Sequence, residues 1–261
     1  MAFYKKSLGQ NFLIDKNIVR KILNLTDITD KEIVEIGPGK GALTDEIIKK
    51  KPRSIVLLEK DDKLTKSLVT KYSNNKSIKI INTDALRFNY ENLNNNKLIL
   101  IGNLPYNVSS QILIKLLKSK NVENKFSDLI LMFQKELGEK IIGRFTTKHY
   151  GRLSIITSLK LRIIKKFFVS PNCFFPKPKV TSMVLHFKTF KNLKYKIKEI
   201  TNLEKVTNIL FSNKRKKINK NIKKLLNNNK LKKIKGLNLD LRPANLEPKM
   251  FYKITEIYER I

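Results

Sequence analysis

The residues best suited to chemistry form a short turn, Asn103-Leu104-Pro105-Tyr106, directly after the apolar run LILIG. An exocyclic amine of a purine is a weak nucleophile because its lone pair is delocalised into the ring. Acceptors beside both N–H bonds make it more reactive, and the side-chain carbonyl of Asn103 and the backbone carbonyl of Leu104 can be those acceptors. Pro105 would fix the turn, and Tyr106 would offer a ring for an unstacked base. The segment indicates group transfer to a base amine; the alternative is an ordinary turn after a buried strand.

A glycine-rich segment, VEIGPGKGALT at 34–44, stands where an apolar run gives way to a helical pattern. Gly37, Gly39 and Gly41 would let the backbone pass close beneath a ligand, and the amides of the following helix N-terminus favour a nucleotide-like group. Glu59 ends the next apolar run and is placed to accept hydrogen bonds from two ribose hydroxyls. The loop alone does not separate NAD from S-adenosylmethionine, and it is also compatible with a purely structural turn.

A further acid, Asp84, follows the third apolar run within NTDAL. A carboxylate at this point can accept a hydrogen bond from the amino group of an adenine ring. Because Glu59 and Asp84 end successive apolar runs, together they favour an adenosine-containing ligand. A nicotinamide oxidoreductase is the alternative, but it rests on the glycine loop alone.

The elements that must position these residues alternate between strand and helix patterns. Strands are expected at 33–36, 54–59, 78–82, 98–101, 129–134, 153–162 and 181–187. Helices are expected from Asp15, as the N-cap, to about Leu25, and then at 42–50, 62–72, 110–118 and 135–143. Residues 1–11 have the character of a basic, loop-like arm, and 92–96 that of a polar loop. The alternation predicts a doubly wound α/β fold, in which the acids and the Asn103 turn meet at one edge of the sheet.

Charge separates the C-terminal part from the rest of the chain. The 261 residues include 55 Lys and Arg against 22 Asp and Glu, a formal net charge of +33. Residues 191–261 have no strand pattern and carry 20 basic and 6 acidic side chains. Within them, 212–235 contains 11 basic residues and no acid. This composition predicts a small helical domain that binds nucleic acid phosphates; a solvated basic face and a membrane-surface helix are the alternatives.

The apolar residues of the basic stretch recur at helical spacing. They are Ile218, Ile222, Leu225 and Leu226. One face of the stretch can therefore pack on protein while the lysines stay exposed.

Several classes of protein are disfavoured by composition. A single cysteine, Cys173, allows no internal disulfide and no cysteine-based zinc site, and His149 and His186 are too far apart in sequence to make a good metal pair. We therefore expect no metal. No run of apolar residues is long enough to span a membrane, and the first 30 residues lack the pattern of a signal peptide. We expect a soluble chain that works in the cytoplasm.

In their order along the chain, these motifs resemble the ribosomal RNA adenine N6,N6-dimethyltransferases, which use S-adenosylmethionine. The matching segments are GQNFLID at 9–15, EIGPGKGALT at 35–44, NLPYNVSSQIL at 103–113, QKELGEKI at 134–141, YGRLSIITSL at 150–159 and FFPKPKVTSMV at 174–184. The resemblance implies a Rossmann-like methyltransferase domain at 1–190 and a small α-helical RNA-binding domain at 191–261.

The resemblance also implies roles for individual residues. Phe174 would sandwich the target base against Tyr106, although a hydrophobic anchor is the alternative for this ring. The implied cofactor contacts are Asn11, Leu13, Gly37, Glu59, Asp84 and Asn103, the implied target-base residues are Asn103, Leu104, Pro105, Tyr106 and Phe174, and the implied RNA contacts are Lys214, Arg215, Lys216, Lys217 and Lys220.

Two branches of the family differ in substrate. One dimethylates two adjacent adenosines in the 3′-terminal hairpin of small-subunit rRNA during subunit assembly, and the other, of the macrolide-resistance type, methylates large-subunit rRNA. The segments LFSNKRKKINKNI at 210–222 and LRPANLEP at 241–248 resemble the first branch. Lys214 and Ala244 depart from its usual Arg and acid, and Lys binds a phosphate as a point charge where Arg would bind it with two parallel bonds. The expected partner is an assembling small subunit bound by a monomer; a non-catalytic assembly or transcription factor is the remaining alternative.

Overall fold

The computed structural model describes residues 10–93, 97–190 and 193–260. The predicted arm at 1–11 and the predicted polar loop at 92–96 fall largely or partly outside these ranges. Within the described ranges, no helix is both long and apolar enough to cross a membrane.

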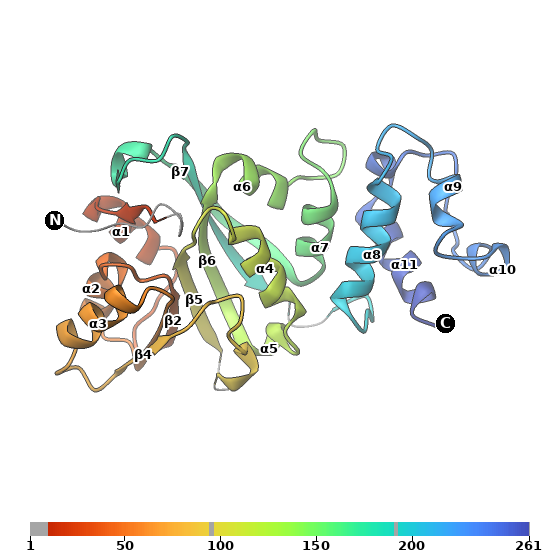
Figure 1. Cartoon of the computed structure of the whole chain (residues 1–261). Helices are drawn as coiled ribbons and strands as arrows, with labels where there is room; N and C mark the ends of the chain where they lie inside the picture. Colours follow the sequence, from red (N-terminus) through yellow and green to blue (C-terminus); the bar gives the residue numbers. More distant parts are fainter. Residues whose placement is uncertain (1–9, 94–96, 191–192, 261) are drawn as a thin grey trace. The chain divides into compact units, whose positions relative to one another are not determined.

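A seven-stranded sheet forms the centre of the fold, with strand order β4-β3-β2-β5-β6-β9-β7 (Figure 1). The pairings from β4 to β6 are parallel, and β9 runs antiparallel to β6. The strands are β2 (Glu32–Ile36), β3 (Ser54–Glu59), β4 (Ile78–Asn82), β5 (Leu98–Asn103), β6 (Phe126–Gln134), β7 (Leu161–Val169) and β9 (Ser182–Thr189). The order reverses between β2 and β5, which is where open α/β sheets bind ligands.

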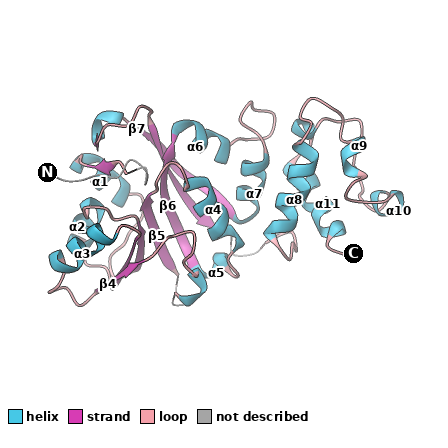
Figure 2. Ribbon diagram, in the orientation of Figure 1, coloured by secondary structure: helices cyan, strands magenta, loops and turns pink. Residues whose placement is uncertain are grey.

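Helices lie on both sides of this sheet (Figure 2). One side carries α1 (Lys16–Leu23), α2 (Ala42–Lys49) and α3 (Asp62–Lys71), whose buried aliphatic side chains join those of the strands in one core cluster. The other side carries α4 (Ser109–Lys118) and α5 (Val122–Lys125), and β6 leads directly into α6 (Lys135–Ile141). Asp15 caps α1, as expected, by accepting hydrogen bonds from the amides of Asn17 and Ile18. The predicted doubly wound α/β fold is thus confirmed.

A two-stranded ribbon flanks the carboxyl edge of the sheet. It pairs β1 (Phe12–Leu13) antiparallel with β8 (Phe174–Phe175), and a short 3-10 helix, η3 (Pro171–Cys173), precedes β8. In this register Phe12 is opposite Phe175, and Leu13 is opposite Phe174. Directly opposed residues share a face of a ribbon, so each pair of side chains points the same way.

The chain forms two compact units, one of residues 1–138 and 162–189 and the other of 139–161 and 190–261. The second unit contains α7 (Arg152–Lys160), α8 (Ile200–Phe211), α9 (Asn219–Ile222), α10 (Asn228–Leu231) and α11 (Pro248–Tyr258). The shorter turns of the chain are the 3-10 helices η2 (Tyr90–Asn92) and η4 (Pro243–Asn245).

The segment 139–161 belongs with the C-terminal helices, whereas the sequence pattern groups it with the sheet. Two buried tyrosines account for this. The hydroxyl of Tyr150 donates to the carbonyl of Leu246 at 2.7 Å, and the hydroxyl of Tyr252 donates to the carbonyl of Ile155 at 2.8 Å. Such bonds link residues almost a hundred positions apart, so no local pattern indicates them.

The strand expected at 153–162 is wrong, because this segment is helix α7. Its β-branched residues suggest a strand. The helix is buried on more than one side, however, and its buried residues are Ser154, Ile155, Ile156, Thr157 and Leu159. Its sequence therefore does not show the regular alternation of polar and apolar residues that identifies a helix. The side chain of Ser154 accepts a hydrogen bond from the Gly151 amide at the helix start. The strand β7 comes later, at Leu161–Val169, and was not expected.

Candidate functional site

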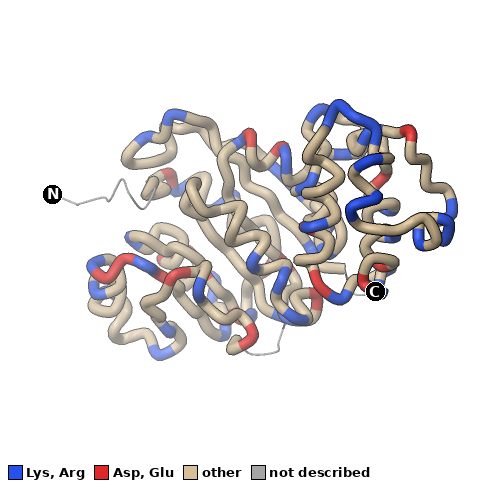
Figure 3. The backbone as a smooth tube through the Cα atoms, turned by 45° about the vertical axis from the view of Figure 1, so that its right-hand side comes forward, with Lys and Arg blue, Asp and Glu red and all other residues tan. Residues whose placement is uncertain are grey.

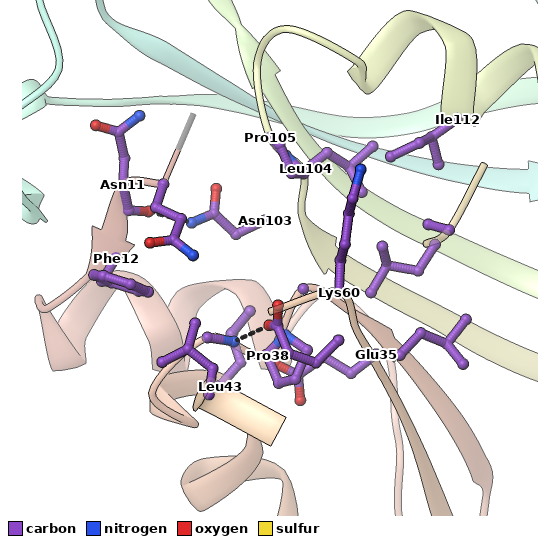
Figure 4. Close-up of a pocket in the computed structure, with 18 of the residues that line it drawn as sticks. Asn11, Phe12, Glu35, Pro38, Leu43, Lys60, Asn103, Leu104, Pro105 and Ile112 are labelled. Atoms are coloured by element: carbon purple, nitrogen blue, oxygen red, sulfur yellow. Dashed lines mark hydrogen bonds between the residues drawn. The ribbon is translucent and has the colours of Figure 1, made fainter. Parts of the chain in front are cut away.

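A cavity of about 1150 Å³, including its open mouth, lies at the carboxyl ends of β2, β3 and β5. It occurs at the point where the strand order reverses, and the ribbon strand β1 closes one side of it. Figure 4 shows the labelled residues converging on this space from several elements. Nine of the sequence-predicted site residues line it: Asn11, Leu13, Gly37, Glu59, Asp84, Asn103, Leu104, Pro105 and Tyr106.

Glu59 lies at the end of β3 and is held by the backbone. Its Oε2 accepts from the Gly39 amide at 3.1 Å, and its Oε1 accepts from the Asp61 amide at 2.9 Å. Burial raises the pKa of Glu59, and the hydrogen bonds from these amides partly offset that shift. Each carboxylate oxygen can accept a second bond, so the fixed carboxylate suits a pair of ribose hydroxyls.

The glycine loop joins β2 to α2 in a conformation that other residues rarely adopt. Gly37 and Gly39 have φ of +68° and +60°. A Cβ on Gly39 would lie 2.8 Å from Cδ1 of Phe12. The Gly37 amide donates to the carbonyl of Leu58 at 2.9 Å, which ties the loop to the neighbouring strand. The loop therefore stays close to the cavity floor, with Phe12 packed against it.

Asp84 follows β4 and has a partner for each carboxylate oxygen. Oδ1 accepts from the Leu86 amide at 2.9 Å, and Oδ2 accepts from Nζ of Lys60 at 2.7 Å. Burial raises the pKa of Asp84, but the bonds from Lys60 and Leu86 outweigh it and hold the pKa below its usual value. Lys60 also lines the cavity, and Figure 4 shows its side chain extended there. Sequence reasoning did not identify Lys60, although it directly follows Glu59.

Asn103, the last residue of β5, is oriented by the N-terminal segment. Its amide nitrogen donates to the backbone carbonyl of Asn11 at 2.8 Å, across 92 positions of sequence (Figure 4). This bond leaves the Asn103 carbonyl oxygen available as an acceptor. The predicted chemistry requires that atom, and Asn11 determines which end of the amide is free.

The rest of the turn, from Leu104 to Tyr106, is fixed by burial and hydrogen bonds. Leu104 is 1% exposed, and the carbonyl of Pro105 accepts from the Val108 amide at 3.2 Å at the start of α4. The Tyr106 hydroxyl is hydrogen-bonded to Oγ of the buried Ser182 on β9. Burial raises the pKa of Tyr106, so the phenol stays protonated at neutral pH. The Tyr106 ring is therefore fixed in place and can offer a face for stacking, and its hydroxyl does not act as a general base.

Phe174 does not line the cavity with the other predicted residues. Its side chain is 3% exposed and packs in the core cluster with Leu13 and Val184. Its position agrees with the alternative of a hydrophobic anchor, since a base cannot stack on a ring inside the core. The neighbouring Phe175 is 55% exposed and shares a face of the ribbon with Phe12.

Glu35 is a further cavity residue, which was not among the residues predicted from the sequence. It is 1% exposed; its Oε2 accepts from the Thr44 hydroxyl at 2.7 Å, and no described residue bonds to its Oε1. Burial raises the pKa of Glu35 to about 8. Its position inside β2, where alternating residues face the helices, was the available signal.

The basic stretch at 212–235 belongs to the second unit and is exposed. Lys214, Arg215, Lys216, Lys217 and Lys220 are all at the surface, and Lys217 pairs with Asp240 at 2.9 Å. Figure 3 shows Lys and Arg gathered around α9 and α10. The apolar residues Ile218, Ile222, Leu225 and Leu226 are buried, as their spacing predicts. The stretch is not one helix, however, because loops separate α8, α9 and α10.

The two histidines occur in different surroundings. His149 lies 3.6 Å from Glu139, and His186 is buried against Asp128 at 2.6 Å. Across the described ranges, no group of three or more His, Cys, Asp or Glu side chains could hold a metal ion.

The sheet order and the acid-lined cavity at the strand reversal are typical of Rossmann-like proteins. A family model described as ribosomal RNA adenine dimethylase matches residues 2–260. The chain therefore belongs to the ribosomal RNA adenine dimethylase family.

Relatives named ribosomal RNA small subunit methyltransferase A are similar over most of their length. The protein of Pelagibacter ubique is 45% identical over 98% of this chain and 97% of its own. That of Malacoplasma penetrans is 36% identical over 97% and 91%. Among solved structures, a dimethyladenosine transferase from Plasmodium falciparum has a TM-score of 0.78 at 22% identity, covering 93% of this chain and 95% of its own. The 23S rRNA methyltransferase ErmE has a TM-score of 0.68 at 22% identity, covering 95% and 100%. These two structures share the fold.

Proposed function

We propose that this protein transfers methyl groups from S-adenosylmethionine to N6 of two adjacent adenosines in the 3′-terminal hairpin of small-subunit rRNA. The observation that carries the proposal is one cavity at the strand reversal that contains both the acids Glu59 and Asp84 and the turn beginning at Asn103. The acids suit an adenosine, and the turn suits an amine. A nicotinamide oxidoreductase would not require the turn that begins at Asn103.

The residues of the cavity fit the methyl donor. The backbone-held carboxylate of Glu59 would bind the ribose hydroxyls, Asp84 would accept from the adenine amino group, and Gly37, Asn11 and Leu13 would border the amino acid part. When bound, S-adenosylmethionine supplies a methyl group on a sulfonium centre whose leaving group is a neutral thioether. Such a reaction depends mainly on alignment.

The turn after β5 would prepare the target amine. The carbonyl oxygen of Asn103 and the backbone carbonyl of Leu104 accept from the two N–H bonds, which localises the nitrogen lone pair. The ring of Tyr106, held by its hydroxyl at Ser182, would support the base after it leaves its helix. Since the Tyr106 phenol stays protonated, the proton lost by N6 goes to solvent.

The choice of the small subunit rests on the relatives. Those named small subunit methyltransferase A are 36–45% identical over nearly the full chain, whereas the likeness to the large-subunit enzyme ErmE is 22% and concerns the fold. The exposed lysines and arginine at 214–217 are consistent with binding rRNA phosphates.

We further propose a division of labour between residues 1–190, which bind the cofactor and perform the transfer, and 191–261, which bind RNA. The substrate is then an assembling small subunit in the cytoplasm, where target bases are still accessible, and the enzyme acts as a monomer. The basic, exposed stretch at 212–235 supports this assignment.

The test is methyl transfer from radiolabelled S-adenosylmethionine to small subunits that lack the modification. We expect labelling by the native protein and a loss of at least about a hundredfold with Asn103→Ala, because oriented acceptors contribute on this scale. Asn124→Ala is the matched control, since Asn124 is exposed in α5 and does not line the cavity. Mass spectrometry should find two dimethylated adenosines.

Two results would contradict the proposal. Labelling of free large-subunit RNA in place of small subunits would indicate the other branch of the family. Cofactor binding without any labelling would indicate a non-catalytic assembly factor.

A further inference from the structure

An open groove lies on the first compact unit, between α1 and the edge strand β7. The six polar residues that line it are Asn17, Arg20, Lys21, Asn24, Lys165 and Lys166. Four of them are cationic, and none of the described residues that line the groove is a carboxylate. We propose that this groove binds the phosphodiester backbone of the RNA helix that carries the target loop, as a second RNA contact besides residues 212–235. This inference rests on the proposed function.

The first wall of the groove is one face of α1. Residues 17, 20, 21 and 24 are exposed and recur at the spacing of a helical stripe, while Val19, Ile22 and Leu23 are buried on the opposite face. Arg20 lies 3.8 Å from Glu46, but it is 60% exposed. The ammonium group of Lys21 lies 4.4 Å from the centre of the Phe167 ring, which belongs to the second wall.

The second wall is β7, which ends the sheet. Lys165 and Lys166 are both exposed in the middle of this strand, and neither forms an ion pair with a residue in the described part of the chain. Lysines on an edge strand can serve simply to prevent aggregation. That explanation does not account for the cations of α1, which face the same groove from a segment more than 140 positions away.

A polyanion is the partner that this lining fits. Unneutralised lysines attract phosphates through counterion release, and the amides of Asn17 and Asn24 can donate to phosphate oxygens. The elements of the groove are connected along the chain to elements that border the cavity: α1 begins three residues after the cavity residue Leu13, and β7 leads through η3 to β8, which pairs with β1. RNA entering the cavity over the ribbon would therefore meet the groove.

The test compares two variants with the same loss of charge. Lys165→Gln/Lys166→Gln alters the groove, and Lys76→Gln/Lys79→Gln alters exposed lysines at the opposite edge of the same sheet, at and just before β4. The probe is a fluorescent RNA hairpin with two adjacent adenosines in its loop, and binding is followed by anisotropy over a series of salt concentrations. Affinity for S-adenosylmethionine reports the integrity of each variant.

We expect the groove variant to bind the hairpin several-fold more weakly. The slope of log affinity against log salt should become shallower by about 1 to 2, the value for one or two lost phosphate contacts. The control variant should keep the native slope. Lys21→Gln, on the other wall, should reproduce the effect in part, which guards against a misfolded double variant.

Equal slopes for the groove and control variants would overturn the inference. Preferential binding of the native protein to phosphatidylglycerol vesicles over the hairpin, lost in the groove variant, would also overturn it by identifying a membrane surface. The proposed function fails separately: hairpin binding that depends on the groove, with no methyl transfer to small subunits, would reject the reaction and leave the groove intact.

Discussion

Asp84 is bound to Lys60 in the structure through its Oδ2, and an adenine amino group would need to compete with this lysine for the carboxylate. The ion pair measures 2.7 Å, and the lysine is 57% exposed, so water screens much of its attraction. A ligand amino group can therefore displace Lys60 at little cost. Substitution of Asp84 and substitution of Lys60 should therefore affect cofactor binding in different ways, although each of them removes the same ion pair.

We predict that Asp84→Ala weakens S-adenosylmethionine binding about tenfold, because a hydrogen bond to a charged acceptor is worth about 1.5 kcal/mol. Lys60→Met should leave the affinity unchanged or raise it up to about fivefold, since an exposed ion pair contributes about 0 to 1 kcal/mol. Isothermal titration calorimetry measures both. If Lys60→Met weakened binding as much as Asp84→Ala, the lysine itself would contact the cofactor.

Glu35 makes stability depend on pH. Burial raises the pKa of this carboxyl from 4.5 to about 8, so the folded protein retains a proton that the unfolded chain releases. The stabilisation from this protonation is complete below pH 4.5 and is lost as the pH rises through about 8.

We predict that Glu35→Gln flattens this dependence, because glutamine stays neutral and can still accept from Thr44. Between pH 4.5 and 8, the free energy of unfolding of the native protein should fall relative to that of the variant, by up to about 1.4 kcal/mol per pH unit. Urea unfolding at a series of pH values measures it. Parallel curves for the two proteins would show that Glu35 is ionised in the fold.

At the scale of elements, the loop between β2 and α2 depends on its backbone conformation. Gly39 combines a positive φ with a close approach to Phe12 of β1, so any side chain there would strain the loop and push on the ribbon. The loop and the ribbon together border the cavity. A change at this position should therefore affect both stability and cofactor binding.

We predict that Gly39→Ala costs about 1 to 3 kcal/mol of stability and weakens S-adenosylmethionine binding. Gly151→Ala is the control, because Gly151 has an extended backbone and nothing within 4 Å of the added Cβ. Urea unfolding and calorimetry measure the two effects. Equal stability of the two variants would mean that Phe12 moves aside without cost.

Short apolar runs bounded by polar residues, and helices with one exposed face, were predictable from sequence. Strands β3 and β4 have the expected bounds, and α2 and α3 differ from expectation by one residue at the end. Helix α7 was not predictable, since its sequence is apolar and β-branched and its burial on several sides comes from the helices of the second unit. The period of a helix can be read from its sequence only where side chains that face water alternate with side chains that face the core.

At the scale of the whole molecule, charge is divided between two surfaces. The stretch 212–235 of the second unit is basic in sequence as well as in space, because its lysines are consecutive or nearly so. The groove of the first unit is basic only in space, since Arg20 and Lys21 are joined with Lys165 and Lys166 by folding. Part of the positive charge that is spread along residues 1–190 in the sequence is thus concentrated at one place by folding.

The sequence by itself determined the α/β class and the cavity residues that follow strands, from Gly37 and Glu59 to Asp84 and Asn103. These depend on local alternation and on the rule that parallel strands end at one edge. Tertiary structure alone decided that Asn11 orients Asn103, that Lys60 binds Asp84, and that Phe174 is buried. Burial and long-range pairing belong to the folded chain, because they depend on which distant residues exclude water from each side chain.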